Sequence, residues 1–241
     1  MTDRAAELAQ NLAATRERIE RACEAAGRDP HDVRLLAVTK NFPATDVALL
    51  ADLKLTDFAE NRDAEADAKV AEFAKLRTTP VKWSMVGRLQ RNKARSVAGW
   101  ADEVQSVDSV RLADALQHAV RASLDRGIRS MNMDVLVQAS IDGDTDRGGC
   151  PLPDLIALSD HIAGLDTLRL RGVMAVAPLG MPPEQAFDQL ATAAGRLRTA
   201  HPTATSLSAG MSGDLETAIA RGSTCVRVGT GLLGSRRLAS P

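Results

Sequence analysis

The sequence predicts an α/β fold, a single (β/α)8 TIM barrel with an N-terminal helix, and three observations support this class. Eight short apolar segments alternate with helical patterns, which favours parallel strands joined by right-handed crossovers. The length of 241 residues is close to the roughly 250 residues of such barrels. No linker or change of composition divides the chain, so we expect one domain over residues 1–241.

The elements follow one another in a regular order. A first helix is predicted over residues 3–26, because apolar residues recur on one stripe and Gly27 and Pro30 follow. The first strand, residues 33–40, is apolar on both faces, as buried parallel strands are, and Asn41 and Pro43 end it. Further strands are predicted at 56–59, 81–86, 103–107, 133–138, 168–176, 205–208 and 224–228. Helices are predicted at 43–53, 62–77, 90–98, 109–126, 152–163, 183–199 and 213–221, and only a glycine-rich tail after the last strand.

Composition limits the classes of function. The net charge of −1 gives no reason to expect nucleic acid or an acidic membrane surface as a partner. Three scattered cysteines favour a reducing compartment over a disulfide framework or a metal site. No apolar run reaches about 18 residues, and no signal peptide is recognisable. We therefore expect a cytoplasmic protein.

Lys40 ends the first predicted strand, and lysine is among the residues least often buried. One interpretation is that its amine simply reaches water at the end of the strand. The other is that the amine is buried at the mouth of the α/β core, where it can act as a Schiff-base nucleophile.

Two loops are placed where barrels of this kind commonly bind phosphate, after strands 7 and 8. The first spans residues 210–214, where Ser212 is predicted to cap a helix whose free N–H groups can bind an anion. The second contains Gly229, Thr230 and Gly231, whose small residues let backbone amides approach a phosphate. Capping and turn formation explain each loop alone, but the two together favour phosphate.

Arg227 lies inside the last predicted strand, two residues before Gly229. A charge at that position is costly unless it has a partner. Arg227 therefore either forms a structural salt bridge or points at a ligand.

Six segments resemble the pyridoxal phosphate homeostasis proteins of the YggS/PROSC type, over nearly the whole chain. The segments are 35–40 (LLAVTK), 58–61 (FAEN), 87–93 (GRLQRNK), 170–174 (LRGVM), 207–212 (LSAGMS) and 222–230 (GSTCVRVGT). The resemblance implies a barrel like the N-terminal domain of alanine racemase, with pyridoxal 5'-phosphate held as an internal aldimine on Lys40. It implies these further roles: phosphate binding by Ser212 and the backbone of Gly229 and Thr230, a hydrogen bond from Arg227 to the pyridine nitrogen, and a ring pocket lined by Asn61 and Met174.

The sequence departs from the pattern of that family at four positions. Ala59 stands where glycine is usual, Arg62 where an aromatic residue often stands, Ser84 where histidine is common, and Arg88 where proline is common. We expect these changes to affect the outer part of the pocket and to leave the lysine, the arginine and the phosphate loops in place.

The resemblance also bears on reactivity. An arginine stays charged and only donates hydrogen bonds, so Arg227 would keep the pyridine nitrogen unprotonated and weaken the cofactor as an electron sink. Alanine racemases take a second acid–base group from a tyrosine of an additional C-terminal domain; this sequence has no tyrosine, and we expect no such domain. These features favour storage, buffering or delivery of the cofactor, with apo-enzymes that require it as candidate partners and an indirect effect on amino-acid and keto-acid metabolism.

Two other readings stay open. The protein could be a weak racemase or another enzyme dependent on pyridoxal phosphate, and such an enzyme turns over amino acids. It could instead be a Schiff-base aldolase that uses Lys40 without the cofactor, and such an aldolase needs a carboxylate or tyrosine relay near the lysine.

Overall fold

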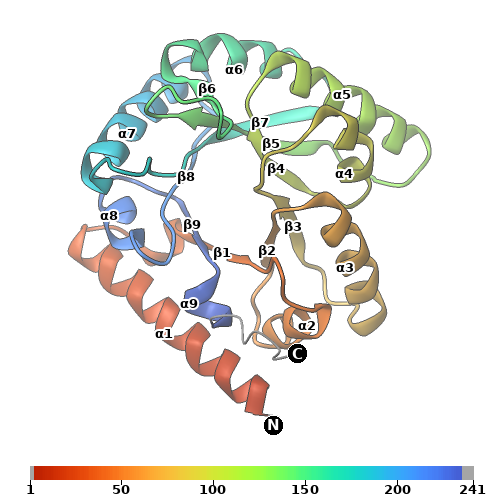
Figure 1. The fold of residues 1–241 in the computed structure, drawn as a ribbon, viewed down its shortest axis with the longest axis vertical. Coiled ribbons are helices and arrows are strands. Elements are labelled where there is room, and N and C mark those ends of the chain that lie inside the picture. Colours follow the sequence, from red (N-terminus) through yellow and green to blue (C-terminus); the bar gives the residue numbers. More distant parts are fainter. Residues whose placement is uncertain (1–2, 235–241) are drawn as a thin grey trace.

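The computed structural model describes residues 3–234, in which parallel strands form a closed ring surrounded by helices (Figure 1). The strands of the ring are β1 (Arg34–Val38), β2 (Asp57–Glu60), β3 (Lys82–Met85), β4 (Glu103–Val107), β5 (Met133–Ser140), β7 (Leu168–Met174), β8 (Ser206–Ser208) and β9 (Cys225–Val228). Parallel pairing of β1 with β9 and of β4 with β5 closes the ring. The predicted (β/α)8 barrel is confirmed.

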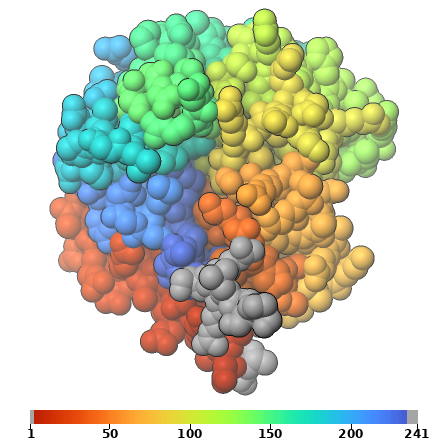
Figure 2. Space-filling model, in the orientation of Figure 1, coloured from red at the N-terminus to blue at the C-terminus, as the bar shows by residue number. Residues whose placement is uncertain are grey.

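Helices cover the outside of the ring. They are α1 (Asp3–Ala25), α2 (Ala44–Asp52), α3 (Asp63–Leu76), α4 (Ala94–Trp100), α5 (Val110–Asp125), α6 (Leu155–Ala163), α7 (Pro183–Ala200), α8 (Leu215–Ala220) and α9 (Thr230–Leu233). The first helix, red in Figure 2, lies against the blue C-terminal segments, where Asn11 donates to the Leu232 carbonyl and Arg18 pairs with Glu216. None of the helices in the described range combines the length and apolar character needed to cross a bilayer.

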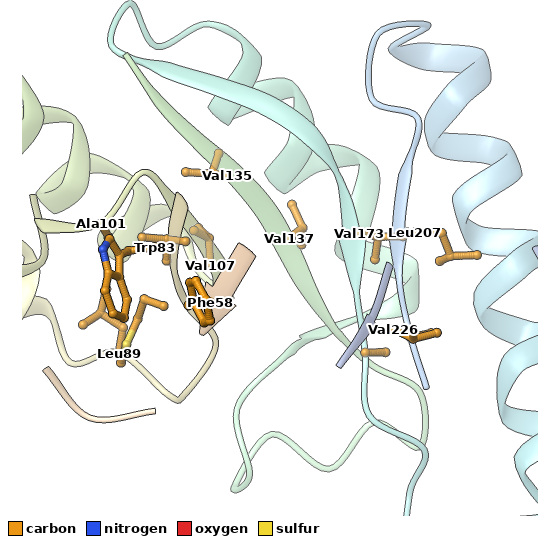
Figure 3. Packing of buried hydrophobic residues seen from close by; sticks show 14 of the residues in the cluster. Phe58, Trp83, Leu89, Ala101, Val107, Val135, Val137, Val173, Leu207 and Val226 are labelled. Carbon is orange, nitrogen blue, oxygen red and sulfur yellow. The ribbon is translucent and has the colours of Figure 1, made fainter. Parts of the chain in front are cut away.

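The main apolar core lies between the ring and the helices. Phe58 of β2 and Trp83 of β3 pack with ring centroids 5.7 Å apart (Figure 3), and Phe73 of α3 meets the edge of Trp83. Side chains alternate between the two faces of a strand, so the residues next to Phe58 and Trp83 face the barrel axis. The helices thus bury one face of every strand, and the other face is left to line the barrel.

The interior of the barrel holds a chain of buried polar groups. Arg34 donates to Glu103, which also accepts from Ser84 and Gln105. Gln105 accepts from Ser208, whose hydroxyl oxygen in turn accepts from Arg227. Because each buried polar group in this chain has a partner, the interior can be polar without the full cost of desolvation.

Three local predictions are wrong. A two-residue strand, β6 (Cys150–Pro151), pairs with the end of β5 where a loop was predicted. Residues 230–233 form the short helix α9 where a tail was predicted, and residues 235–241 of that tail lie outside the described residues. Ser212 is not a helix cap, because α8 begins at Leu215 and Asp214 occupies the N-cap position. Each error concerns a segment of only a few residues, in which local backbone geometry outweighs the sequence pattern.

Candidate cofactor-binding site

A cavity of about 630 Å³ opens at the carboxyl ends of β1, β7 and β9. Every residue to which the resemblance assigns a role lines it: Lys40, Asn61, Met174, Ser212, Arg227, Gly229 and Thr230. Val38, Phe42, Val86, Val176 and Met211 give the cavity an apolar wall. The fold thus brings together groups that are up to 190 residues apart in the sequence, between Lys40 and Thr230.

Strand periodicity explains why these side chains meet. In β1, Leu36 and Val38 face the barrel axis, and the same alternation directs Lys40 to the same side. Leu36 is in register with Arg227 of the neighbouring strand β9, so Arg227 also faces the axis. The carboxyl ends of parallel strands lie at one end of a barrel, which places both cations around the same opening.

Lys40 itself is exposed, which agrees with the interpretation that it reaches water at the end of the strand and not with burial in the core. Its backbone, however, is held on both sides by α3. The Lys69 ammonium donates to the Thr39 carbonyl at 2.7 Å, and the Asn41 N–H donates to the Glu65 carboxylate at 2.5 Å. Asn41 has a φ of 67°, a conformation that asparagine tolerates better than most residues. These contacts fix the direction in which the lysine leaves the strand.

A buried network supports this arrangement. Glu60 is 0% exposed and Lys69 is 6% exposed, with 2.6 Å between the ammonium and the carboxylate. The Thr39 hydroxyl donates to the same carboxylate oxygen at 2.5 Å, whereas the other oxygen of Glu60 has no partner within the described residues. Burial raises the pKa of Glu60 above its ordinary value, although the hydrogen bonds from Lys69 and Thr39 oppose this shift.

From the sequence alone, Glu60 precedes the predicted helix over residues 62–77 and can serve as its cap, and nothing indicates a role for Lys69. In the structure the N-cap of α3 is Arg62, which makes no side-chain capping bond. Glu60 and Lys69 lie nine positions apart on a strand and a helix, a spacing that matches no periodic pattern. A carboxylate at the end of a short strand, at Glu60, was the available signal, because such a residue requires a partner when buried.

Arg227 is 4% exposed and makes no salt bridge with a carboxylate among the described residues. Its guanidinium donates to the Ser208 hydroxyl and to the Ala175 carbonyl, each at 2.7 Å. Burial lowers the pKa of Arg227 below its ordinary value. Of the two roles considered from sequence, the direct salt bridge is absent, so a buried cation with neutral partners lines the cavity.

The two predicted phosphate loops lie side by side. The Gly231 N–H donates to the Ser212 hydroxyl oxygen at 3.3 Å, which leaves the hydroxyl proton of Ser212 free to donate. A Cβ on Gly231 would lie 3.3 Å from that oxygen and 3.2 Å from Val228, and a Cβ on Gly229 would lie 3.4 Å from the Val38 carbonyl oxygen. Small residues therefore keep the floor of this part of the cavity open.

The four departures from the family pattern fall in two places. Ala59 and Ser84 are fully buried in β2 and β3 and do not line the cavity, which corrects the expectation that all four affect its outer part. Arg62 and Arg88 line a neighbouring hollow. Asn61 borders both spaces, and its close contact with Gly87 leaves no room for a side chain at that glycine.

The cavity fits pyridoxal phosphate on chemical grounds. Lys40 offers a primary amine for an aldehyde, and the apolar wall suits the face of a pyridine ring. Arg227 offers a donor to a ring nitrogen, and Ser212 with the glycine loop offers donors to a phosphate. Within residues 3–234, the cavity lining contains no carboxylate and no histidine.

Comparison with known proteins places the chain in a family. The sequence pattern of the family described as "Alanine racemase, N-terminal domain" matches residues 10–237. A curated protein of Mycobacterium leprae named pyridoxal phosphate homeostasis protein is 46% identical over 248 residues, which cover 99% of this chain and 96% of that protein. The chain belongs to the pyridoxal phosphate homeostasis protein family. An Escherichia coli protein of the same name is 37% identical and is covered over 97% of its length.

Solved structures of other proteins have the same fold. The structure of PipY from Synechococcus elongatus with pyridoxal phosphate bound is 33% identical to this chain and has a TM-score of 0.80, covering 94% of this chain and 100% of that one. An alanine racemase from Clostridium difficile shares the fold at 15% identity, with a TM-score of 0.72. That match covers 97% of this chain and 58% of the racemase.

Proposed function

We propose that this protein binds pyridoxal 5'-phosphate on Lys40 and serves intracellular homeostasis of that cofactor, by storage, buffering or delivery. The observation that carries the proposal is the single cavity in which an amine, a buried arginine and a glycine-rich anion loop converge. In this proposal the whole chain is a single binding domain, and the protein acts in the cytoplasm. Apo-enzymes that require the cofactor are its proposed recipients.

Each residue has a separate task in this proposal. Bound pyridoxal phosphate supplies an aldehyde that can condense with a lysine amine with loss of water. Lys40 is the lysine that would bind the aldehyde carbon. The contacts from α3 to Thr39 and Asn41 fix the backbone that carries this lysine. Ser212 and the amides of Gly229 and Thr230 hold the phosphate, and the apolar wall, which includes Met174, excludes water from the ring.

The role of Arg227 favours binding over turnover. A guanidinium donates hydrogen bonds and cannot accept them, so a ring nitrogen facing Arg227 has to accept and stays unprotonated. An unprotonated ring withdraws electrons weakly, and carbanion chemistry on amino acids is slow as a result. We therefore propose that the protein carries the cofactor without acting as an efficient enzyme.

A titration tests the proposal. Added pyridoxal phosphate is expected to bind with a stoichiometry of one per chain and to produce a saturable absorption band in the visible range. The same sample, supplied with D- or L-amino acids, is expected to show no multiple turnover in an assay for racemised product. Failure of the protein to take up the cofactor would contradict the proposal. Rapid turnover of an amino acid would show instead that the protein is an enzyme.

Replacing Ser212 by alanine is expected to weaken binding of pyridoxal phosphate by about tenfold or more, because a hydrogen bond to a charged group contributes about 1.5–3 kcal/mol. Binding of pyridoxal, which has no phosphate, is expected to be unchanged. Equilibrium dialysis with both compounds measures the difference. Ser206→Ala is the matched control, since Ser206 is partly buried at the opposite end of β8 and lines a different pocket. Equal losses for both compounds would contradict the assignment of Ser212 to the phosphate.

A further inference from the structure

A second hollow, of about 950 Å³, lies beside the cofactor cavity and shares Asn61 with it. Three loops at the carboxyl ends of β2, β3 and β4 form it, and their orange and yellow surfaces adjoin in Figure 2. Five basic side chains line this hollow, which we call the basic hollow: Arg62, Arg88, Arg91, Lys93 and Arg111. Among the described residues its lining contains two carboxylates, Asp63 and Asp108.

The cations of the basic hollow lack ionic partners. None of the five forms a salt bridge with a carboxylate in residues 3–234, and the guanidinium of Arg88 donates only to the Asp146 carbonyl. One of the two acids is already engaged, because Asp63 accepts from the Trp100 indole. Like charges gathered without counter-charges repel one another, and a concave surface concentrates their field. The arrangement is therefore suited to an anion that enters from solution.

Backbone groups add to this field. The helix α5, which is 16 residues long, begins at the basic hollow with Ser109 as its N-cap. Ser109 makes no side-chain capping bond, and no acidic residue stands in the first turn of the helix. The first N–H groups of such a helix have no partner within it, and its dipole favours negative charge there.

The size and charge of the basic hollow indicate the class of ligand. Near neutral pH a single phosphate carries at most about two negative charges, and it fills a small part of 950 Å³, so it neutralises only part of the five cations that the three loops supply. The lining contains no aromatic side chain, which disfavours the base stacking by which single-stranded nucleic acids bind. A single arginine side chain can bind a phosphate group through two parallel hydrogen bonds, so several arginines suit a ligand with several phosphate groups.

We infer that the basic hollow binds a small molecule with two or more linked phosphates, at a site separate from the cofactor cavity. The shared chemistry of such ligands is the phosphate chain, with or without a nucleoside. Because the two sites meet at Asn61, both ligands would lie next to each other at the same end of the barrel.

Calorimetric titration with inorganic tripolyphosphate at low ionic strength tests this inference on the full chain. Saturable binding at one site is expected, and the double variant Arg91→Gln/Arg111→Gln is expected to bind at least about tenfold more weakly. The control is Arg16→Gln/Arg126→Gln, which removes the same charge from two exposed arginines outside the basic hollow. Protein saturated with pyridoxal phosphate is expected to bind tripolyphosphate still.

The outcomes separate this inference from the proposed function, because the titration requires no cofactor. The inference would be overturned if tripolyphosphate showed no saturable binding, if the control variant bound it as weakly as the Arg91/Arg111 variant does, or if pyridoxal phosphate displaced it completely. Adenosine triphosphate serves as a second probe. Equal affinity for both probes assigns binding to the phosphate chain, and tighter binding of the nucleotide adds a contact with the nucleoside.

Discussion

Replacing Lys69 by methionine is expected to lower the free energy of unfolding by about 3–5 kcal/mol at neutral pH. The change leaves the carboxylate of Glu60 buried without its counter-charge, and loss of one partner of a buried pair typically costs this much. Chemical denaturation monitored by circular dichroism measures the loss. The double variant Glu60→Gln/Lys69→Met is expected to recover much of it, because glutamine keeps a hydrogen bond with Thr39 and carries no charge.

The effect of Lys69→Met is expected to depend on pH in a defined direction. Burial raises the pKa of Glu60 in the folded state, so the folded protein holds this proton more tightly than the unfolded chain does. Such a group contributes stability below its unfolded pKa, and that contribution is lost as the pH rises through the folded pKa. Lys69 lowers the pKa of Glu60. Removing Lys69 therefore raises that pKa further and widens the pH range over which the stability contribution is lost. The difference between wild type and variant should therefore grow from about pH 4.3 towards neutrality.

A loss below about 1 kcal/mol, or a loss of the same size at every pH, would contradict the charge-pair account of this network. The network also bears on the site, since Lys69 holds the Thr39 carbonyl beside Lys40. Weaker uptake of the cofactor by the folded Lys69→Met variant is the matching functional result.

The strand–helix order and the positions of Lys40 and Arg227 were accessible from sequence for a physical reason, whereas Asn61 and Met174 were assigned only through the family resemblance. Parallel strands in a barrel are buried on both sides, so each appears as a short apolar run with a clear end. The segment Glu103–Val107 was predicted residue for residue. The C-terminal end of each apolar strand marks the face of the barrel where active sites lie. Lys40 and Arg227 could be placed at that face from their positions in the strands.

The features that sequence reasoning missed depend on contacts between elements. Exposure of Lys40, which the sequence left as one of two interpretations, depends on how the loop after β1 leaves the barrel, and the clamp by Glu65 and Lys69 depends on the packing of α3. The polar chain from Arg34 to Arg227 crosses the barrel through residues far apart in sequence. In the sequence, Arg88, Arg91 and Lys93 look like the solvated start of a helix, and nothing there indicates that Arg62 and Arg111, which lie on other elements, join them in one hollow.

Lys40→Ala is expected to abolish covalent attachment of the cofactor entirely, because no other residue lining the cavity carries a primary amine among those described. Non-covalent contacts of the phosphate and the ring remain, so weak and reversible binding is expected to persist. Lys75→Ala, which removes an exposed lysine at the end of α3, is the matched control and should attach the cofactor as wild type does.

Borohydride reduction of the protein saturated with pyridoxal phosphate, followed by peptide mass mapping, tests the central claim most directly. The reduced phosphopyridoxyl group is expected on the peptide that contains Lys40 in wild type and in Lys75→Ala, and on no peptide in Lys40→Ala. A label on another lysine, or undiminished labelling of Lys40→Ala, would contradict the account of this site.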